Sequence, residues 1–141
     1  MSDLTARSIW FFIQEIILIS SCLLHCSSSI CEASPELLVL EKDNDRTLEI
    51  RQDETVRISL TENATTGYRW AIDRYDSEFI EAVAVEPSYR ANPVGSGGEV
   101  GFIFKCKKIG SGQILLKQWR SWEGEASIIK RFNLRLNIWQ P

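Results

Sequence analysis

Residues 131–139 read RFNLRLNIW, in which apolar and polar side chains alternate strictly from Phe132 to Ile138. Successive side chains of a β-strand point to opposite faces, so this period of two predicts a strand with one buried face and one solvent face. Residues 56–60, VRISL, repeat the pattern. After residue 35, no stretch of ten or more residues keeps its apolar side chains at helical spacing. The sequence therefore predicts an all-β domain.

Short runs rich in β-branched and aromatic residues continue to the C-terminus, separated by Asn, Asp, Gly, Ser and Pro. This spacing is typical of strands joined by turns. The expected strands are residues 37–40, 48–51, 56–60, 68–72, 80–85, 101–107, 114–119 and 131–139. Two sheets that bury their apolar faces against each other give an antiparallel β-sandwich of about seven strands. We expect Trp70, Trp119 and Trp139 to lie in its core.

The composition excludes several classes of function. The 141 residues are 44% hydrophobic and 25% charged, which fits one small globular domain. The net charge of −3 offers no basic surface to a nucleic acid or to anionic lipid. The only histidine is His25, so the folded part has no imidazole to accept a nucleophile's proton. One cysteine without histidine makes no zinc site, so we expect no metal, no cofactor and no catalysis.

The first 33 residues differ from the rest of the chain. Residues 9–24, IWFFIQEIILISSCLL, form a largely apolar run, and a Ser-rich stretch follows it. This pattern resembles an export signal, with a short membrane anchor as the alternative. We expect residues 1–33 to be a signal or anchor and residues 34–141 to be the folded domain. The protein would then be exported, either secreted or periplasmic.

Three of the four cysteines, Cys22, Cys26 and Cys31, lie in this leading segment. The folded part keeps only Cys106, which cannot form an internal disulfide and is expected to be an inert, packed thiol. Residues 19–22, ISSC, resemble a bacterial lipoprotein box, so lipidated Cys22 would tether the protein to a membrane. Cleavage after Ala33 is the alternative.

The order of the strands predicts which loops are neighbours. Consecutive strands of an up-and-down chain reverse direction, so alternate connections emerge at the same end, provided that no parallel crossover intervenes. This rule selects residues 61–67, 86–100 and 120–130. These loops include NATTGYRW at 63–70, VGSGG at 94–98 and RSWEG at 120–124. We expect the three to lie side by side.

In this order, the three loops resemble the signatures of the chagasin family of cysteine-protease inhibitors, which are Asn-Pro-Thr-Thr-Gly-aromatic, Gly-x-Gly-Gly and Arg-Pro-Trp. The resemblance covers residues 36–139. It implies an immunoglobulin-like sandwich that reversibly and competitively blocks the active-site cleft of papain-type (cathepsin-like) cysteine proteases. We also expect the protein to be a monomer. The protease-binding residues implied by this match are Asn63, Ala64, Thr65, Thr66, Gly67, Tyr68, Gly95, Gly97, Gly98, Arg120 and Trp122.

The residue types in the first loop suit this role. Small hydroxyl side chains at Thr65 and Thr66 can hydrogen-bond within a narrow polar cleft, and Gly67 permits a tight turn that an extended substrate would not adopt. Ala64 and Ser121 stand where the family usually has proline. Because proline fixes φ, we expect the first and third loops to be looser without it.

The other two loops suit backbone and aromatic contacts. Gly97 and Gly98 have no side chains, so their backbone can come close to exposed backbone of an enzyme. Trp122 is expected on an apolar patch beside the cleft, and Arg120 either props its loop or contacts the enzyme.

Each motif also has a plainer interpretation: a polar hairpin turn, a flexible linker and a core tryptophan. The alternative function is a non-catalytic immunoglobulin-like adhesion or envelope module that uses a sheet face or edge. A carboxylate-dependent glycosidase ranks last, because Asp and Glu are scattered singly.

Overall fold

Eight strands and three short 3₁₀-helices form the domain. The computed structural model describes residues 35–89 and 97–141. In chain order the elements are β1 (Glu36–Leu40), η1 (Glu41–Asp43), β2 (Arg46–Arg51), β3 (Thr55–Glu62), η2 (Ala64–Thr66), β4 (Arg69–Tyr75), β5 (Ile80–Ser88), β6 (Gly98–Cys106), β7 (Gly110–Trp119), η3 (Glu125–Ser127) and β8 (Lys130–Trp139). The prediction of an all-β fold is confirmed, with eight strands in place of about seven.

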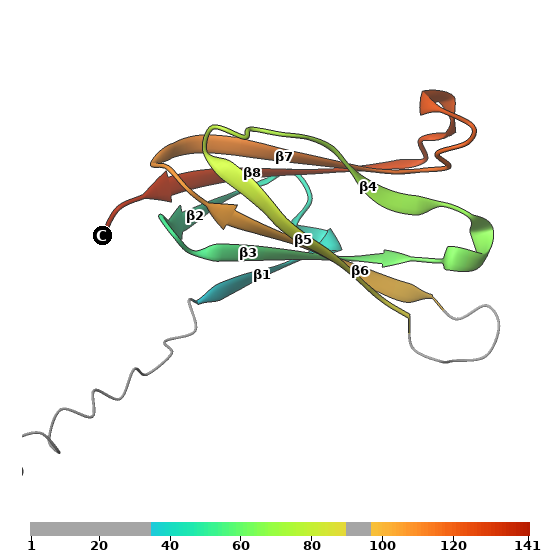
Figure 1. The fold of residues 1–141 in the computed structure, drawn as a ribbon, viewed down its shortest axis with the longest axis horizontal. Coiled ribbons are helices and arrows are strands. Elements are labelled where there is room, and N and C mark those ends of the chain that lie inside the picture. Colours follow the sequence, from blue (N-terminus) through green and yellow to red (C-terminus); the bar gives the residue numbers. More distant parts are fainter. Residues whose placement is uncertain (1–34, 90–96) are drawn as a thin grey trace, which may run out of the picture. The chain divides into compact units, whose positions relative to one another are not determined.

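The strands form two four-stranded sheets, in the orders β1-β3-β6-β5 and β2-β8-β7-β4 (Figure 1). The β3-β6, β5-β6, β4-β7 and β7-β8 pairs are antiparallel. However, β1 runs parallel to β3 and β2 runs parallel to β8, so both sheets are mixed. In a chain that reverses direction at every strand, partners an even number of strands apart must be parallel. The predicted sandwich is confirmed, and the prediction of antiparallel pairing throughout is corrected at these two edges.

The core lies between the sheets and follows the alternation in the sequence. Val56, Ile58 and Leu60 of β3 are fully buried, as are Leu134 and Leu136 of β8. The other buried apolar residues that are packed with them are Val39, Ile50, Trp70, Ile80, Val100, Phe102, Phe104, Cys106, Ile114, Leu116, Phe132 and Ile138. Both sheets therefore contribute side chains to one continuous core.

The tryptophans do not all lie in the core. Trp70 is buried as expected, but Trp139 is 40% exposed, so its predicted core position is wrong. Because Ile138 faces inward, the next residue of β8 must face outward, where Arg51 lies 5.2 Å from the Trp139 ring. Trp119 is half-buried and also lies on an outer face, next to Lys117 (4.2 Å).

Cys106 is the free cysteine of the described residues and is completely buried. Burial, together with the nearby Glu54 carboxylate, raises the pKa of the Cys106 thiol to about 11. Since the thiolate is the reactive form of cysteine, this side chain is unreactive at neutral pH, in line with the expected packed thiol.

The second loop is shorter than predicted, because the β5-β6 ladder continues through Pro87↔Val100 and Ser88↔Glu99. Pro87 is tolerated there since β5 is an edge strand. In residues 35–89 and 97–141, no helix has the length and apolar character needed to span a bilayer. The predictions for the leading segment, Cys22 included, concern residues outside the described part.

The core interpretation predicts that Leu134→Ala lowers the free energy of unfolding by about 2–5 kcal/mol, because it removes buried methyl groups and leaves a cavity. Leu38→Ala is the matched control, since Leu38 is 57% exposed and should lose no more than about 0.5 kcal/mol. Chemical denaturation of both variants measures the difference. Equal losses would contradict the placement of Leu134.

Candidate functional site

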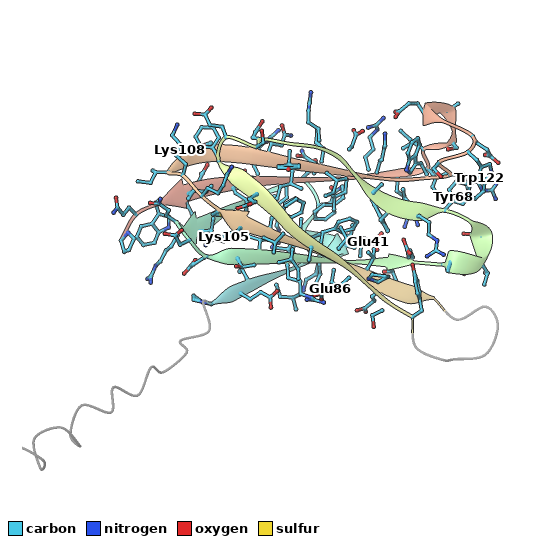
Figure 2. The ribbon with its side chains drawn as sticks, in the orientation of Figure 1. Glu41, Tyr68, Glu86, Lys105, Lys108 and Trp122 are labelled. Carbon is cyan, nitrogen blue, oxygen red and sulfur yellow. The ribbon has the colours of Figure 1, made fainter. Side chains whose placement is uncertain are left out.

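Three pairs of strand ends lie at the same end of the sandwich: β3 leads to β4 through residues 63–68, β7 leads to β8 through residues 120–129, and β5 ends at Ser88 beside the start of β6. In Figure 1 the β3–β4 and β7–β8 connections lie at the end opposite the C-terminus. Figure 2 shows Tyr68 and Trp122 together at this end, with Lys105 and Lys108 toward the other. The predicted neighbourhood is confirmed for the first and third loops. Gly95 lies outside the described residues.

The first loop is a capped 3₁₀ turn. The Asn63 side chain accepts hydrogen bonds from the backbone N–H of Thr65 (3.1 Å) and from the Thr65 hydroxyl (2.6 Å). The Thr66 hydroxyl donates to the Asn63 carbonyl oxygen (2.8 Å). Gly67 ends the turn in the left-handed conformation, with φ of 77°. Asparagine at the start and glycine at the end are the residues that this geometry favours.

The hydrogen bonds within the first loop determine what the threonine hydroxyls can offer to a binding partner. Thr65 and Thr66 are exposed, yet both hydroxyl protons are used inside the loop. The Thr65 oxygen therefore offers its lone pairs to a partner. The Thr66 oxygen already accepts from the Tyr68 backbone N–H (3.4 Å) and keeps one lone pair with which to accept from a partner. The turn closes although position 64 is alanine and not proline. The hydrogen bonds within it act against the loosening expected from Ala64, which stays a prediction.

Arg120 ties the third loop to the first. Its guanidinium donates to the Thr66 carbonyl oxygen from Nη2 (3.0 Å) and Nε (3.3 Å), and pairs through Nη1 with Glu123 (2.9 Å). The guanidinium carbon lies 4.3 Å from the centre of the Tyr68 ring. Of the two predicted roles for Arg120, the structure shows the supporting one.

Trp122 also joins these two loops. Its side chain is 68% exposed, so its expected position in a loop, outside the core, is confirmed. One edge of the indole covers Gly67 so closely that a Cβ at position 67 would lie 2.7 Å from the Trp122 ring carbon Cη2. The threonine turn and Trp122 thus form one surface, and only glycine fits at their junction.

The base of the third loop is held by buried polar groups. The Ser127 hydroxyl accepts from the Arg120 backbone N–H (3.0 Å) and lies 2.7 Å from the Gly124 carbonyl oxygen. Below it, the Lys117 ammonium pairs with Asp73 (3.0 Å) and with Glu125. The hydrogen bond from Lys117 lowers the pKa of Asp73, and the bonds to Glu125 and Asp73 raise the pKa of Lys117. The loop is therefore anchored to both β4 and β7.

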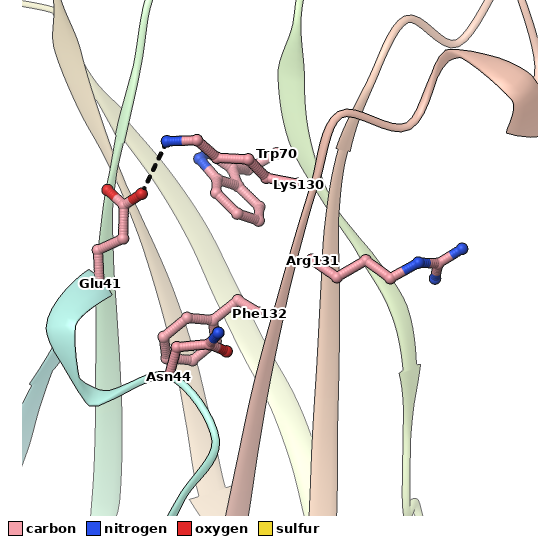
Figure 3. Close-up of a pocket in the computed structure, with 6 residues that line it drawn as sticks. All are labelled: Glu41, Asn44, Trp70, Lys130, Arg131 and Phe132. Atoms are coloured by element: carbon pink, nitrogen blue, oxygen red, sulfur yellow. Dashed lines mark hydrogen bonds and ion pairs between the residues drawn. The ribbon is translucent and has the colours of Figure 1, made fainter.

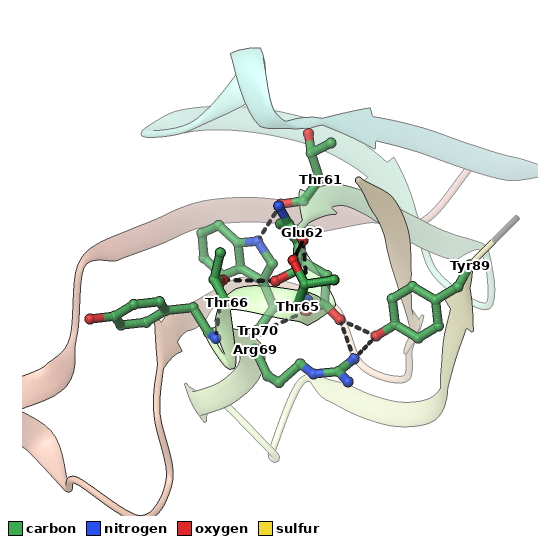
Figure 4. Close-up of polar contacts among 9 residues, drawn as sticks. Thr61, Glu62, Thr65, Thr66, Arg69, Trp70 and Tyr89 are labelled. Carbon is green, nitrogen blue, oxygen red and sulfur yellow. Dashed lines mark hydrogen bonds and ion pairs between the residues drawn. The ribbon is translucent and has the colours of Figure 1, made fainter. Parts of the chain in front are cut away.

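A buried carboxylate supports the first and second loops, and the sequence interpretation missed it (Figure 4). Glu62 is only 4% exposed. It accepts hydrogen bonds from the Trp70 backbone N–H (2.9 Å), from Arg69 (3.0 Å) and from the Tyr89 hydroxyl. Burial, and then the bond to Glu62, raises the pKa of Tyr89. The signal was present, because Glu62 continues the inward alternation of 56–60, and a buried carboxylate needs partners.

A cavity of about 260 Å³ lies beside Trp70 (Figure 3). Glu41 and Lys130 form an ion pair of 3.0 Å at this cavity, and the hydrogen bond from Lys130 lowers the pKa of Glu41. The Glu41 carboxylate at this cavity is thus already paired with the Lys130 ammonium. Among the residues that the structure describes, no three His, Cys, Asp or Glu side chains gather as a metal ion would require.

Comparison with known proteins identifies the class. Residues 49–136 match the family model described as "Chagasin family peptidase inhibitor I42". The chain belongs to this family of peptidase inhibitors. Amoebiasin-1 of Entamoeba histolytica is 31% identical over 100 residues, which are 70% of this chain and 95% of that protein.

Two solved structures resemble the domain. The crystal structure of the cysteine protease inhibitor EhICP2 from Entamoeba histolytica has a TM-score of 0.67 and 24% identity, over 74% of this chain and 96% of that one. This likeness concerns the fold. The solution structure of Amebosin has a TM-score of 0.64 and 29% identity, over 75% of this chain and 100% of that one.

The energy of the contact between Gly67 and Trp122 can be measured by making Gly67→Ala both in the unaltered protein and in a Trp122→Ala variant. Gly67→Ala places a Cβ at a positive φ, which costs about 1–2 kcal/mol of stability in either background. With Trp122 present, the clash with the indole should add about 1–3 kcal/mol. With Trp122→Ala, the added cost should vanish. Denaturation of the four proteins gives the coupling energy, and a cost that is equal in both backgrounds would show that the two residues do not interact.

Proposed function

We propose that this protein is a reversible, competitive inhibitor of papain-type cysteine proteases whose three loops fill the active-site cleft. The family membership supports inhibition of a peptidase. The observation that carries the proposal is the single surface formed by the first and third loops, through the Arg120–Thr66 bonds and the Trp122–Gly67 contact. Two loops that support each other can enter a cleft with little further ordering, which reduces the entropic cost of binding.

The chemistry of the target explains why a turn can block without being cut. A papain-type enzyme attacks with a thiolate that is paired with an imidazolium, and the attack requires a peptide carbonyl in line with the sulfur. The first loop presents a 3₁₀ turn that ends in left-handed Gly67. An extended substrate does not have this backbone, so the loop occupies the cleft without offering the geometry for attack. Thr65 and Thr66 then accept hydrogen bonds from donors in the cleft.

The other loops add contact area on either side of this turn. Trp122 presents a large, rigid and exposed ring, the type of side chain that most often dominates interface energy. Gly97 is exposed next to the start of β6 and can pair through its backbone with the enzyme. A standard interface buries about 1,600 Å² in total, which three loops at one end of a sandwich can supply. The protein acts as a monomer, without catalytic turnover and without a cofactor.

Inhibition of papain and of a cathepsin by the purified protein tests this proposal. Trp122→Ala should raise the inhibition constant about 30-fold or more, as loss of an interface hot spot does. Thr66→Asp should raise it about tenfold or more, because a carboxylate would replace a hydroxyl beside the enzyme thiolate. Trp139→Ala, at the opposite end of β8, is the matched control and should leave inhibition unchanged. Failure of the unaltered protein to inhibit, or full inhibition by both loop variants, would reject the proposal.

We also propose that residues 1–33 direct export, because the apolar run at 9–24 and the small residues after it have the pattern of a signal. An exported inhibitor would meet proteases outside the cytoplasm. Mass spectrometry of the protein from its native membrane and medium fractions would find a lipidated N-terminus at Cys22 or a free one after Ala33. An intact N-terminus would refute cleavage.

A further inference from the structure

The cluster of Glu62, Arg69 and Tyr89 lies at the stems of the first and second loops, with Glu62 buried and Arg69 and Tyr89 partly exposed (Figure 4). Its members come from three places in the chain: Glu62 ends β3 just before the first loop, Arg69 begins β4 just after that loop, and Tyr89 follows the last residue of β5 at the start of the second loop. One carboxylate thus contacts the stems of two loops.

Both carboxylate oxygens of Glu62 accept hydrogen bonds, and each has different donors. Oε2 accepts from the Trp70 backbone N–H (2.9 Å), which fixes the carboxylate to β4. Oε1 accepts from the Tyr89 hydroxyl and from Arg69 (3.0 Å), and Arg69 also donates to the Tyr89 hydroxyl oxygen. A buried carboxylate that lost these partners would be left unsatisfied, so the cluster strongly favours a single position for Tyr89.

The Tyr89 ring in turn determines where the glycines lie. A Cβ at position 98 would overlap this ring, with Tyr89 Cε1 only 2.9 Å away, so only glycine fits beneath it. The backbone of Gly98 is also the ladder partner of Glu62 in the β3-β6 pair. Glu62 therefore reaches Gly98 by two routes, through its own backbone and through the Tyr89 side chain. Gly98 is buried. Glycine at this position is therefore needed for packing against Tyr89 within the protein, in addition to the predicted contact with a protease.

We propose that Glu62 and Tyr89 are positioning residues for inhibition: they set the position of Gly97 and Gly98 relative to the threonine turn. This inference rests on the proposed function. Affinity for a papain-type protease then depends on the Tyr89 hydroxyl, although that hydroxyl acts through the glycines. Tyr89 and Gly98 act as a pair, because the ring occupies the space that a side chain at 98 would need.

Tyr89→Phe in the full chain tests the proposal, because it keeps the ring over Gly98 and removes only the hydroxyl. Glu62 keeps its bonds to Arg69 and Trp70, so the variant should fold. We expect the amide resonances of Gly97 and Gly98 to move in ¹⁵N NMR spectra, and the inhibition constant for papain to rise about tenfold, as loss of one hydrogen bond to a charged group would allow.

Tyr75→Phe is the matched control, since Tyr75 lies at the far end of β4 and should alter neither the glycine amides nor inhibition. Glu62→Gln combined with Tyr89→Phe should raise the inhibition constant by less than the product of the single effects, because both changes break the same contact. Unmoved glycine resonances in Tyr89→Phe would overturn the positioning role, and so would moved resonances with unchanged inhibition. If the unaltered protein fails to inhibit papain, the proposed function fails, while the resonances still report whether Tyr89 positions the glycines.

Discussion

The hydrogen bonds from Arg120 to the Thr66 carbonyl oxygen join two loops that are 54 residues apart in sequence. Without these hydrogen bonds, the first loop with its threonine turn and the third loop with Trp122 would move more independently of each other. Arg120 is suited to the task because its planar guanidinium can donate to the carbonyl, pair with Glu123 and lie against Tyr68 at the same time. The indole of Trp122 over Gly67 completes the junction by packing. An inhibitor that must fit a rigid cleft gains affinity from such pre-organisation.

The sandwich makes this junction possible, because it brings the ends of β3 and β7 together although they belong to different sheets. Reversal of direction at each strand places their following loops at one end. The same rule produces the parallel pairing of β1 with β3 and of β2 with β8, so the mixed sheets and the loop cluster have one cause. Lys117 and Ser127 then fasten the base of the third loop to the frame.

Glu62 shows how a local exception to the core pattern can carry function. An inward-facing carboxylate at the end of β3 is unfavourable unless it accepts hydrogen bonds. Its donors include Arg69 and the backbone N–H of Trp70, which directly follow the first loop. The protein therefore holds a polar cluster where a leucine or valine would continue the alternation. An apolar residue there could not direct Tyr89, and the position of Gly98 depends on Tyr89.

The sequence by itself located the eight strand segments, the inward faces of β3 and β8, and the common end of the first and third loops, because these follow from the period of two and from reversal at each turn. Its motifs also predicted the protease-binding residues of the loops. The prediction that Trp139 lies in the core was wrong, although the alternation with Ile138 already implied an outward side chain. The sequence did not determine the partners of Glu62. Only the tertiary structure decided that Arg120 supports Thr66 and that Tyr89 covers Gly98. Those contacts join residues far apart in the chain, and their geometry depends on side-chain directions in three dimensions, which no local pattern specifies.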